Sequence, residues 1–207
     1  MGVVLRRRLN ESSPISSRIE TENIIEMLKV LYAEEIQAWY QYYIVSNFMQ
    51  GQQRKSIEQL FVDTAKDELD DHANKLLKRI SELGGNISSI SDINLLSNIA
   101  NCEYKIPQEP YNTIKLLEDN IEGEICAIKH YIELADITKD KDYTTYCMAI
   151  EILGDEEEHL RSLQDFYVDI TGHEYEINDF DEFNVYKSNF NIDLPSHEDI
   201  VYIIKGE

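Results

Sequence analysis

The chain has 207 residues, which is enough for one domain with its own hydrophobic core and additional terminal segments. Its hydrophobic content is 43% and its charged content 29%, and no apolar run approaches the length of a membrane span, so the composition excludes an integral membrane protein. Forty acidic against nineteen basic residues give a formal net charge of -21, which disfavours binding to DNA and favours the attraction of cations.

The first half of the chain predicts two long helices. Apolar residues recur at helical spacing over residues 20–49, with no Pro or Gly until Gly51. The same period resumes over residues 54–83 and ends at Gly84 and Gly85, which are typical C-cap residues. Because the link between the helices is short, we expect them to pack as an antiparallel hairpin.

A second hairpin is expected after an irregular segment. Residues 86–111 contain Pro107 and Pro110 and show no sustained period, so they predict a crossover. Helical periodicity returns over residues 113–138 and 143–170. Two short links and one long crossover predict an all-α four-helix bundle whose second and third helices run parallel.

The two ends of the chain differ from the predicted bundle. We expect an N-terminal arm over residues 1–19, the four-helix bundle over 20–172, and an acidic, aromatic C-terminal extension over 173–207. The extension ends in VYIIKGE, which predicts a short strand. We expect it to dock on the bundle or on a neighbouring subunit.

Each predicted helix carries one glutamate on its otherwise apolar face, and two helices add a histidine one turn later. The glutamates are Glu35, Glu68, Glu124 and Glu156, and the histidines are His72 and His159. Four buried carboxylates need a compensating positive charge, because an isolated ionised carboxylate in a core is strongly unfavourable. Four carboxylates and two imidazoles are the ligands of a di-iron or di-manganese site. We therefore expect two iron ions, with manganese or zinc as alternatives.

Other residues near this pattern have simpler interpretations. Tyr42 lies on the same helical stripe as Glu35, where core packing is its first role and hydrogen bonding or electron donation to the metal site is the alternative. Trp39 is interpreted in the same way, as a core residue first and a redox relay second. His130 is interpreted as a surface or hydrogen-bonded residue rather than as a ligand.

Three segments carry a resemblance to a known family. They are Glu35-Ile-Gln-Ala-Trp-Tyr-Gln-Tyr42, Glu124-Ile-Cys-Ala-Ile and Asp155-Glu-Glu-Glu-His159. Over about residues 21–171 the chain resembles bacterioferritins and, more closely, the Dps-like proteins called thioferritins. This resemblance implies a ferritin-like bundle and a homo-oligomeric cage of twelve subunits.

The resemblance also implies an activity. Such a protein oxidises Fe(II) with hydrogen peroxide or dioxygen, stores ferric iron and protects against oxidative stress. The implied catalytic residues are Glu35, Glu68, His72, Glu124, Glu156, His159 and Tyr42, and all of these except Tyr42 are the implied metal ligands.

The chain has three cysteines, too few for a disulfide framework, and its start lacks the apolar core of a secretory signal, so we expect a cytoplasmic location. Cys102 and Cys126 match the cysteine positions of the thioferritins, which implies a redox pair near the metal site. Two ordinary buried thiols are the alternative. Cys147 has no counterpart in the family.

The second helix departs from the family's motif. There the glutamate precedes the histidine by three residues, whereas four residues separate Glu68 from His72 and Leu69 takes the usual glutamate position. Both spacings keep the two side chains on one helical face. A small rotation of the pair or a π-bulge would absorb the extra residue.

Two other classes of function remain open from the sequence. The same ligands suit a di-manganese catalase or a di-iron oxidase that stores no iron. A structural or cargo protein would keep the bundle without metal and act through its C-terminal extension. The chain has no rubredoxin-like pair of Cys-x-x-Cys motifs, which argues against a rubrerythrin.

Overall fold

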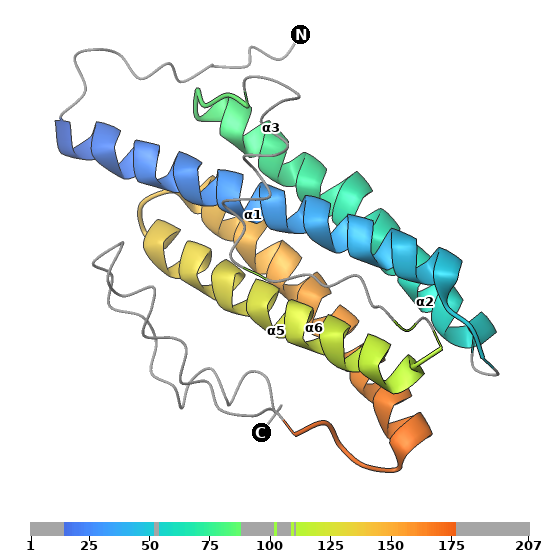
Figure 1. Ribbon diagram of the computed structural model, residues 1–207. Helices are drawn as coiled ribbons and strands as arrows, with labels where there is room; N and C mark the ends of the chain where they lie inside the picture. The colour runs from blue at the N-terminus through green and yellow to red at the C-terminus, as the bar shows by residue number, and fades with distance from the viewer. Residues whose placement is uncertain (1–14, 52–53, 88–101, 103–108, 110, 177–207) are drawn as a thin grey trace, which may run out of the picture. The chain divides into compact units, whose positions relative to one another are not determined.

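The computed structural model describes residues 15–51, 54–87, 102, 109 and 111–176, and the regular structure in these parts is entirely helical (Figure 1). The prediction of four long helical segments is confirmed. They comprise α1 (Ile15–Phe48), the continuous run α2 (Arg54–Lys66), η1 (Asp67–Ala73) and α3 (Asn74–Glu82), then α5 (Thr113–Thr138) and α6 (Tyr143–Thr171). The predicted crossover lies almost wholly outside the described residues.

The chain divides into two compact units, and the first holds α1 with most of the second helical run. In this unit α1 lies beside η1 and α3, antiparallel to them (Figure 1). Its core is formed by fully buried apolar side chains, among them Leu28, Leu31, Phe61, Leu76 and Ile80. These residues recur at helical spacing, so the period seen in the sequence marks the buried faces.

The second helical run ends at the predicted glycines. Gly84 has a φ of 89°, a conformation that side chains with a Cβ rarely adopt. The N–H of Gly85 donates to the carbonyl of Ile80, and a Cβ on Gly85 would lie 2.7 Å from Ile25 of α1. This close approach leaves no room for a larger residue at the end of the run.

The second unit holds α5 and α6, which pack side by side as an antiparallel pair (Figure 1). Both helices begin at a side-chain cap, in which Asn112 accepts from the N–H of Lys115 and Asp142 from the N–H of Thr145. At its other end α6 stops at Gly172, which has a φ of 73°. The core of this unit includes Leu117, Ile121, Ile128, Tyr131, Ile152, Leu160 and Leu163.

The structure describes a part of each expected terminal segment. Helix α1 begins at Ile15, so it extends into the segment expected to be an arm; Pro14 directly precedes it, and proline favours the first turn of a helix. After α6, Tyr175 packs edge-on against Tyr167 and its hydroxyl donates to Glu122 on α5. The predicted strand at VYIIKGE lies outside the described residues.

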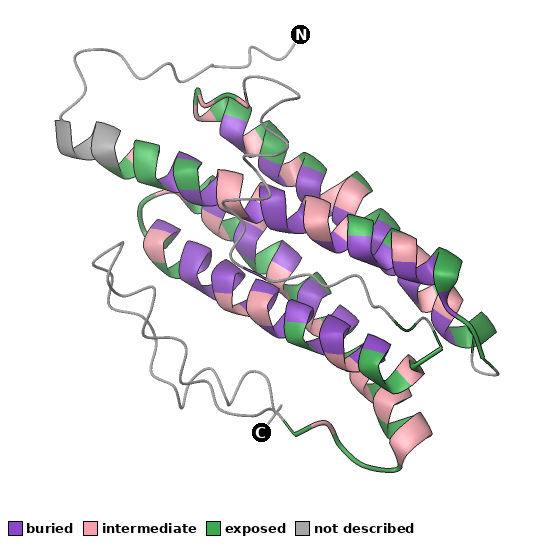
Figure 2. Cartoon of the chain, in the orientation of Figure 1, coloured by how far each residue is buried: buried purple, intermediate pink, exposed green. Residues whose placement is uncertain are grey.

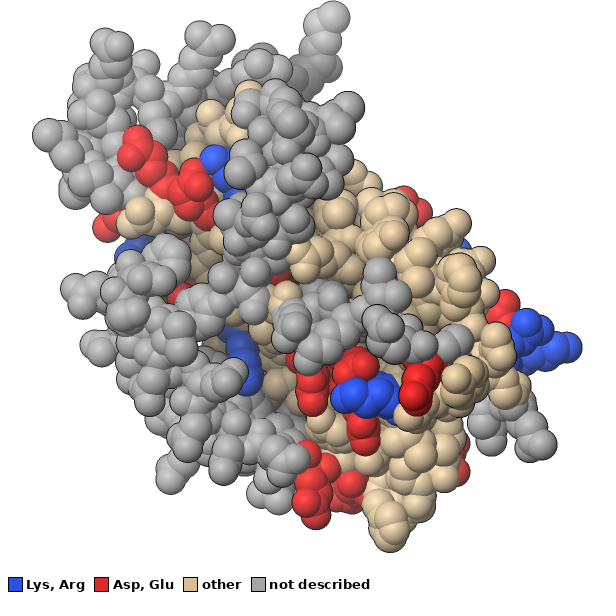
Figure 3. All heavy atoms as spheres, in the orientation of Figure 1, with Lys and Arg blue, Asp and Glu red and all other residues tan. Residues whose placement is uncertain are grey.

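Many charged side chains are exposed on the helices, whereas a smaller set of carboxylates, Glu35 and Glu156 among them, is buried. Figure 2 shows buried and exposed residues alternating along α1, α2 and α3, whereas most residues of α5 are buried. Figure 3 shows acidic side chains gathered around isolated basic ones on the visible face. No helix in the described ranges has an apolar stretch of the length that a membrane span requires.

The cap of α6 provides a stability test. Asp142 accepts hydrogen bonds from both the backbone N–H and the hydroxyl of Thr145, which is fully buried. Asp142→Ala removes both bonds and is expected to lower the free energy of unfolding by about 1–2 kcal/mol. Urea denaturation of this variant and of Lys141→Ala, an exposed neighbour, measures the effect. An equal midpoint for the two variants would show that the cap contributes nothing.

Candidate metal centre

The first unit contains a buried cluster of two glutamates and one histidine. Glu35 comes from α1, and Glu68 and His72 come from η1. The Nδ1 atom of His72 lies 3.0 Å from Oε2 of Glu68 and 3.6 Å from Oε2 of Glu35. All three side chains are at most 3% exposed, and their potential ligand atoms lie within 4.8 Å of one another. The predicted residues of this half are therefore brought together as expected from their spacing.

A π-helical turn places Glu68 and His72 on the same buried face. The segment η1 covers Asp67–Ala73, and Glu68, His72 and Ala73 are its buried residues. Leu69 is half-buried and Asp70 is exposed. A π-helix has a wider turn than an α-helix, so it accommodates the extra residue between the glutamate and the histidine. Of the two explanations that the sequence allowed, the structure shows the bulge, extended over seven residues.

Two aspartates lie between these two ligand candidates: Asp70 is exposed, and Asp71 has a carboxylate oxygen within 4.8 Å of a ring nitrogen of His72. Asp71 is partly exposed and its carboxylate pairs with Lys75 one turn later. This pairing gives Asp71 a structural partner on the surface of the helix. The local acidic run therefore divides into buried and solvent-facing carboxylates according to helical position.

The second unit contains a matching cluster. Glu124 comes from α5, and Glu156 and His159 come from α6. The Nδ1 atom of His159 lies 3.2 Å from Oε2 of Glu156, and the potential ligand atoms of all three residues lie within 4.8 Å of one another. Glu124 and Glu156 are 1% exposed and His159 is 8% exposed. Here the histidine follows the glutamate by three residues on a regular α-helix.

The composition of both clusters suits a divalent metal ion. Two carboxylates and one imidazole are held close together and away from water, where ionised carboxylates repel each other and lose their hydration. A divalent cation offsets both effects. Carboxylate oxygens and imidazole nitrogens together are ligands that iron, manganese and zinc accept. The donor set therefore fits a metal ion in each unit.

Two aromatic residues lie on α1 near Glu35. Tyr42 is 1% exposed and packs edge-on against Phe61, with 5.3 Å between the ring centroids. This supports its interpretation as a core residue. Trp39 is only half-buried, so it does not belong to the fully buried core.

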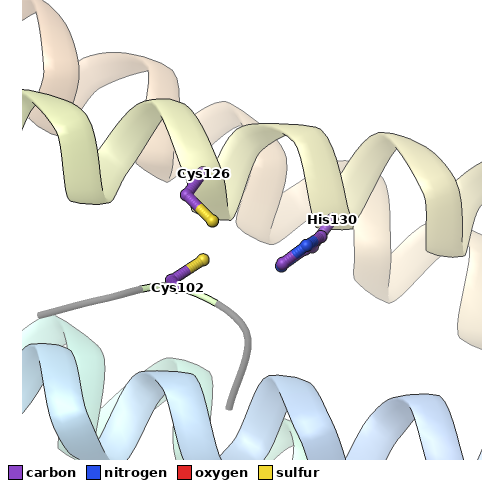
Figure 4. Close-up of side chains that lie close together, drawn as sticks. All are labelled: Cys102, Cys126 and His130. Carbon is purple, nitrogen blue, oxygen red and sulfur yellow. The ribbon is translucent and has the colours of Figure 1, made fainter. Parts of the chain in front are cut away.

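The cysteines fall into two groups. Cys102 and Cys126 are disulfide-bonded, whereas Cys147 is a free, exposed thiol on α6. Cys126 and His130 project from the same side of α5, one turn apart (Figure 4). In the first unit the backbone N–H of Cys102 donates to Glu34, 3.2 Å away.

Two further polar residues are buried: Glu34, which sequence reasoning did not single out, and His130, which it interpreted as a surface or hydrogen-bonded residue. Glu34 is 1% exposed and His130 is 7% exposed. The four-residue spacing between Cys126 and His130 was a signal for a shared helical face. No comparable signal marked Glu34, whose carboxylate accepts a hydrogen bond from a residue far away in the sequence, Cys102.

The chain is similar in sequence to known ferritin-like proteins. Residues 25–172 match the family model for the ferritin-like domain, named Ferritin. Over 144 residues the chain is 35% identical to the DNA protection during starvation protein of Pyrococcus furiosus, and the match covers 68% of this chain and 75% of that protein.

The fold is also similar to solved structures. A dodecameric thioferritin, the bacterioferritin-related protein of Bacteroides fragilis, is 34% identical with a TM-score of 0.70, covering 76% of this chain and 94% of that one. Dps from Listeria monocytogenes is 17% identical with a TM-score of 0.63, over 69% of this chain and 92% of that one. The second likeness concerns the fold alone.

The π-helical turn generates a metal-binding test. Because His72 faces the buried cluster, His72→Ala is expected to weaken metal affinity by about tenfold or more. Asp70→Ala is the matched control, since Asp70 lies on the same segment but is exposed, so its loss should leave affinity unchanged. Anaerobic calorimetric titration with Fe(II) measures both variants. Equal affinity in His72→Ala and the parent protein would show that this segment does not bind metal.

Proposed function

The chain belongs to the ferritin-like domain family, and from that membership we propose that it oxidises Fe(II) at a two-metal carboxylate centre and stores the ferric product. The observation that carries this proposal is the pair of buried clusters, each with two glutamates and one histidine. Buried carboxylates in this number serve no purpose in packing, because apolar residues of similar size fill a core at lower cost.

The two clusters supply the ligands for two iron ions. Glu35, Glu68 and His72 form one ligand set, and Glu124, Glu156 and His159 form the other. Carboxylates stabilise the additional positive charge that iron gains on oxidation, so they favour the ferric product over Fe(II). In each cluster the Nδ1 atom of the histidine lies beside a glutamate oxygen, 3.0 Å away for His72 and 3.2 Å for His159, so an ion bound there would take both atoms as ligands.

The reaction consumes iron and oxidant together. Two Fe(II) ions each lose one electron, and hydrogen peroxide takes both electrons and two protons to become two water molecules. Dioxygen is the alternative oxidant. Removing Fe(II) and peroxide in one two-electron step suppresses the radical chemistry of the free species, which connects the activity to protection against oxidative stress.

The charge of the chain supports the uptake of Fe(II). Its net charge of -21 creates a potential that attracts cations. Many of the acidic groups are solvent-facing, as Figure 3 shows for one face, and they are separate from the buried clusters. Cations are therefore concentrated around the protein before they reach the ligands.

Loss of a buried glutamate tests the activity. Glu156→Ala removes a ligand, so rapid Fe(II) oxidation should fall by at least about tenfold, while the helical content persists because alanine is a good helix former. Glu158→Ala, on the same helix but exposed, is the matched control. Stopped-flow absorbance of ferric iron and circular dichroism report the two properties. Unchanged oxidation in both Glu156→Ala and Glu35→Ala would exclude this centre.

Storage requires a closed assembly, and we propose a homo-oligomeric cage of twelve subunits. The support is the similarity to the dodecameric Bacteroides fragilis protein. Analytical ultracentrifugation should give a mass twelve times that of the chain, and iron-loaded samples should contain far more than two iron atoms per subunit. A monomer or dimer that binds only two metals would instead indicate an oxidase or catalase without storage.

A further inference from the structure

One stretch of α1 contrasts with the rest of this acidic protein. Residues 36–50 contain no charged side chain, although 29% of the whole chain is charged. The surface over this half of α1 is correspondingly uncharged in Figure 3. The stretch contains Trp39, Tyr40 and Tyr43, and the two tyrosines are 48% and 51% exposed. These aromatic residues therefore extend from the protein interior to its surface.

Trp39 and Tyr43 form a stacked pair. Their ring centroids are 6.0 Å apart and their planes are inclined by 26°. Tyr40 is at a similar distance, 6.2 Å, but its ring is tilted by 56° against the indole, so its overlap is poorer. Half of Tyr43 is exposed, so core packing does not account for the stacking.

The stacked pair lies on the same side of α1 as Glu35 of the buried cluster. Glu35, Trp39 and Tyr43 follow one another at intervals of four residues, which places them along one side of α1. Each interval advances by about 6 Å along the helix axis. Burial decreases along this line, from 3% exposure at Glu35 through half-buried Trp39 to 51% exposure at Tyr43.

We propose that Trp39 and Tyr43 form an electron relay that carries an oxidising equivalent from the Glu35 cluster to the protein surface. The relay rests on the proposed function, since Fe(II) and peroxide at the cluster supply the reaction. It acts when only one Fe(II) is present per peroxide. In that case Fe(II) supplies one electron to the peroxide and the protein has to supply the second. Without this second electron, cleavage of the peroxide releases a hydroxyl radical.

The electron balance of this step is complete. Hydrogen peroxide accepts two electrons as its O–O bond breaks, one from Fe(II), which becomes Fe(III), and one from the indole of Trp39. The indole radical cation then takes one electron from Tyr43, whose phenol proton combines with one of the two hydroxides formed. The products are one Fe(III), one hydroxide, one water and a neutral radical at Tyr43, a side chain that is 51% exposed in the single chain.

The transfer from Tyr43 to Trp39 can be measured without metal. Trp39 is the single tryptophan of the chain, so pulse radiolysis with azide radicals creates a tryptophan radical at one known position. In the metal-free full-length protein its absorbance should decay as tyrosyl absorbance rises. This intramolecular phase should have a rate that is independent of protein concentration.

Matched variants identify the partner of Trp39. Tyr43→Phe keeps the stacked ring but lacks the oxidisable phenol, so the intramolecular phase should slow severalfold. Tyr40→Phe should change the rate much less, because the Tyr40 ring is tilted, and Tyr143→Phe, an exposed tyrosine on α6, should not change it. A parent-like rate in Tyr43→Phe, or loss of the phase in Tyr40→Phe alone, would overturn the proposed relay.

A second arm uses iron and separates the relay from the proposed function. With one Fe(II) per chain and excess peroxide, freeze-quench EPR should detect a tyrosyl radical in the parent protein and much less in Tyr43→Phe. With two Fe(II) per peroxide, both proteins should oxidise iron at the same rate. If metal-free transfer is observed but Fe(II) is not oxidised, the proposed function fails and the Trp39–Tyr43 transfer remains. If oxidation occurs without the radical, the relay fails.

Discussion

The burial of carboxylate side chains is the constraint on which the rest of this structure depends. Glu35, Glu68, Glu124 and Glu156 are each at most 3% exposed, and an unpaired buried charge costs several kcal/mol. A cation that binds only the folded protein offsets this cost and stabilises the fold by mass action. The buried apolar residues on the same helical faces stabilise the packed helices and so hold the glutamates in position.

The same constraint accounts for the irregular part of the second helical run. An α-helix orders its side chains by a fixed rotation, so an extra residue between Glu68 and His72 changes their relative positions. The π-turn restores a common buried face, at the expense of regular α-helical hydrogen bonds over seven residues. Departures from ideal backbone geometry are typical of functional sites, where the local loss of stability is offset elsewhere.

The outer surface has a different electrostatic character from the second half of α1. Acidic groups dominate the sequence, which keeps cations near the protein and makes copies of it repel each other. Residues 36–50 lack charge and expose tyrosines. Uncharged aromatic residues lose less hydration free energy than charged ones when they pack together, so Trp39 and Tyr43 stack without an ion pair between them.

The helices and the residues of the candidate site could be predicted from the sequence, because helical periodicity is a local property. Apolar spacing predicted the four helical segments, and a glutamate in each apolar stripe, with His72 and His159 one turn later, predicted both clusters. Other features depended on tertiary packing. The sequence allowed a rotation of the pair or a bulge, and the structure shows a π-helical turn over Asp67–Ala73. Glu34 accepts a hydrogen bond from Cys102, 68 residues further along the chain, which no local pattern marks. The Trp39–Tyr43 stack likewise required side-chain orientations that spacing alone leaves open.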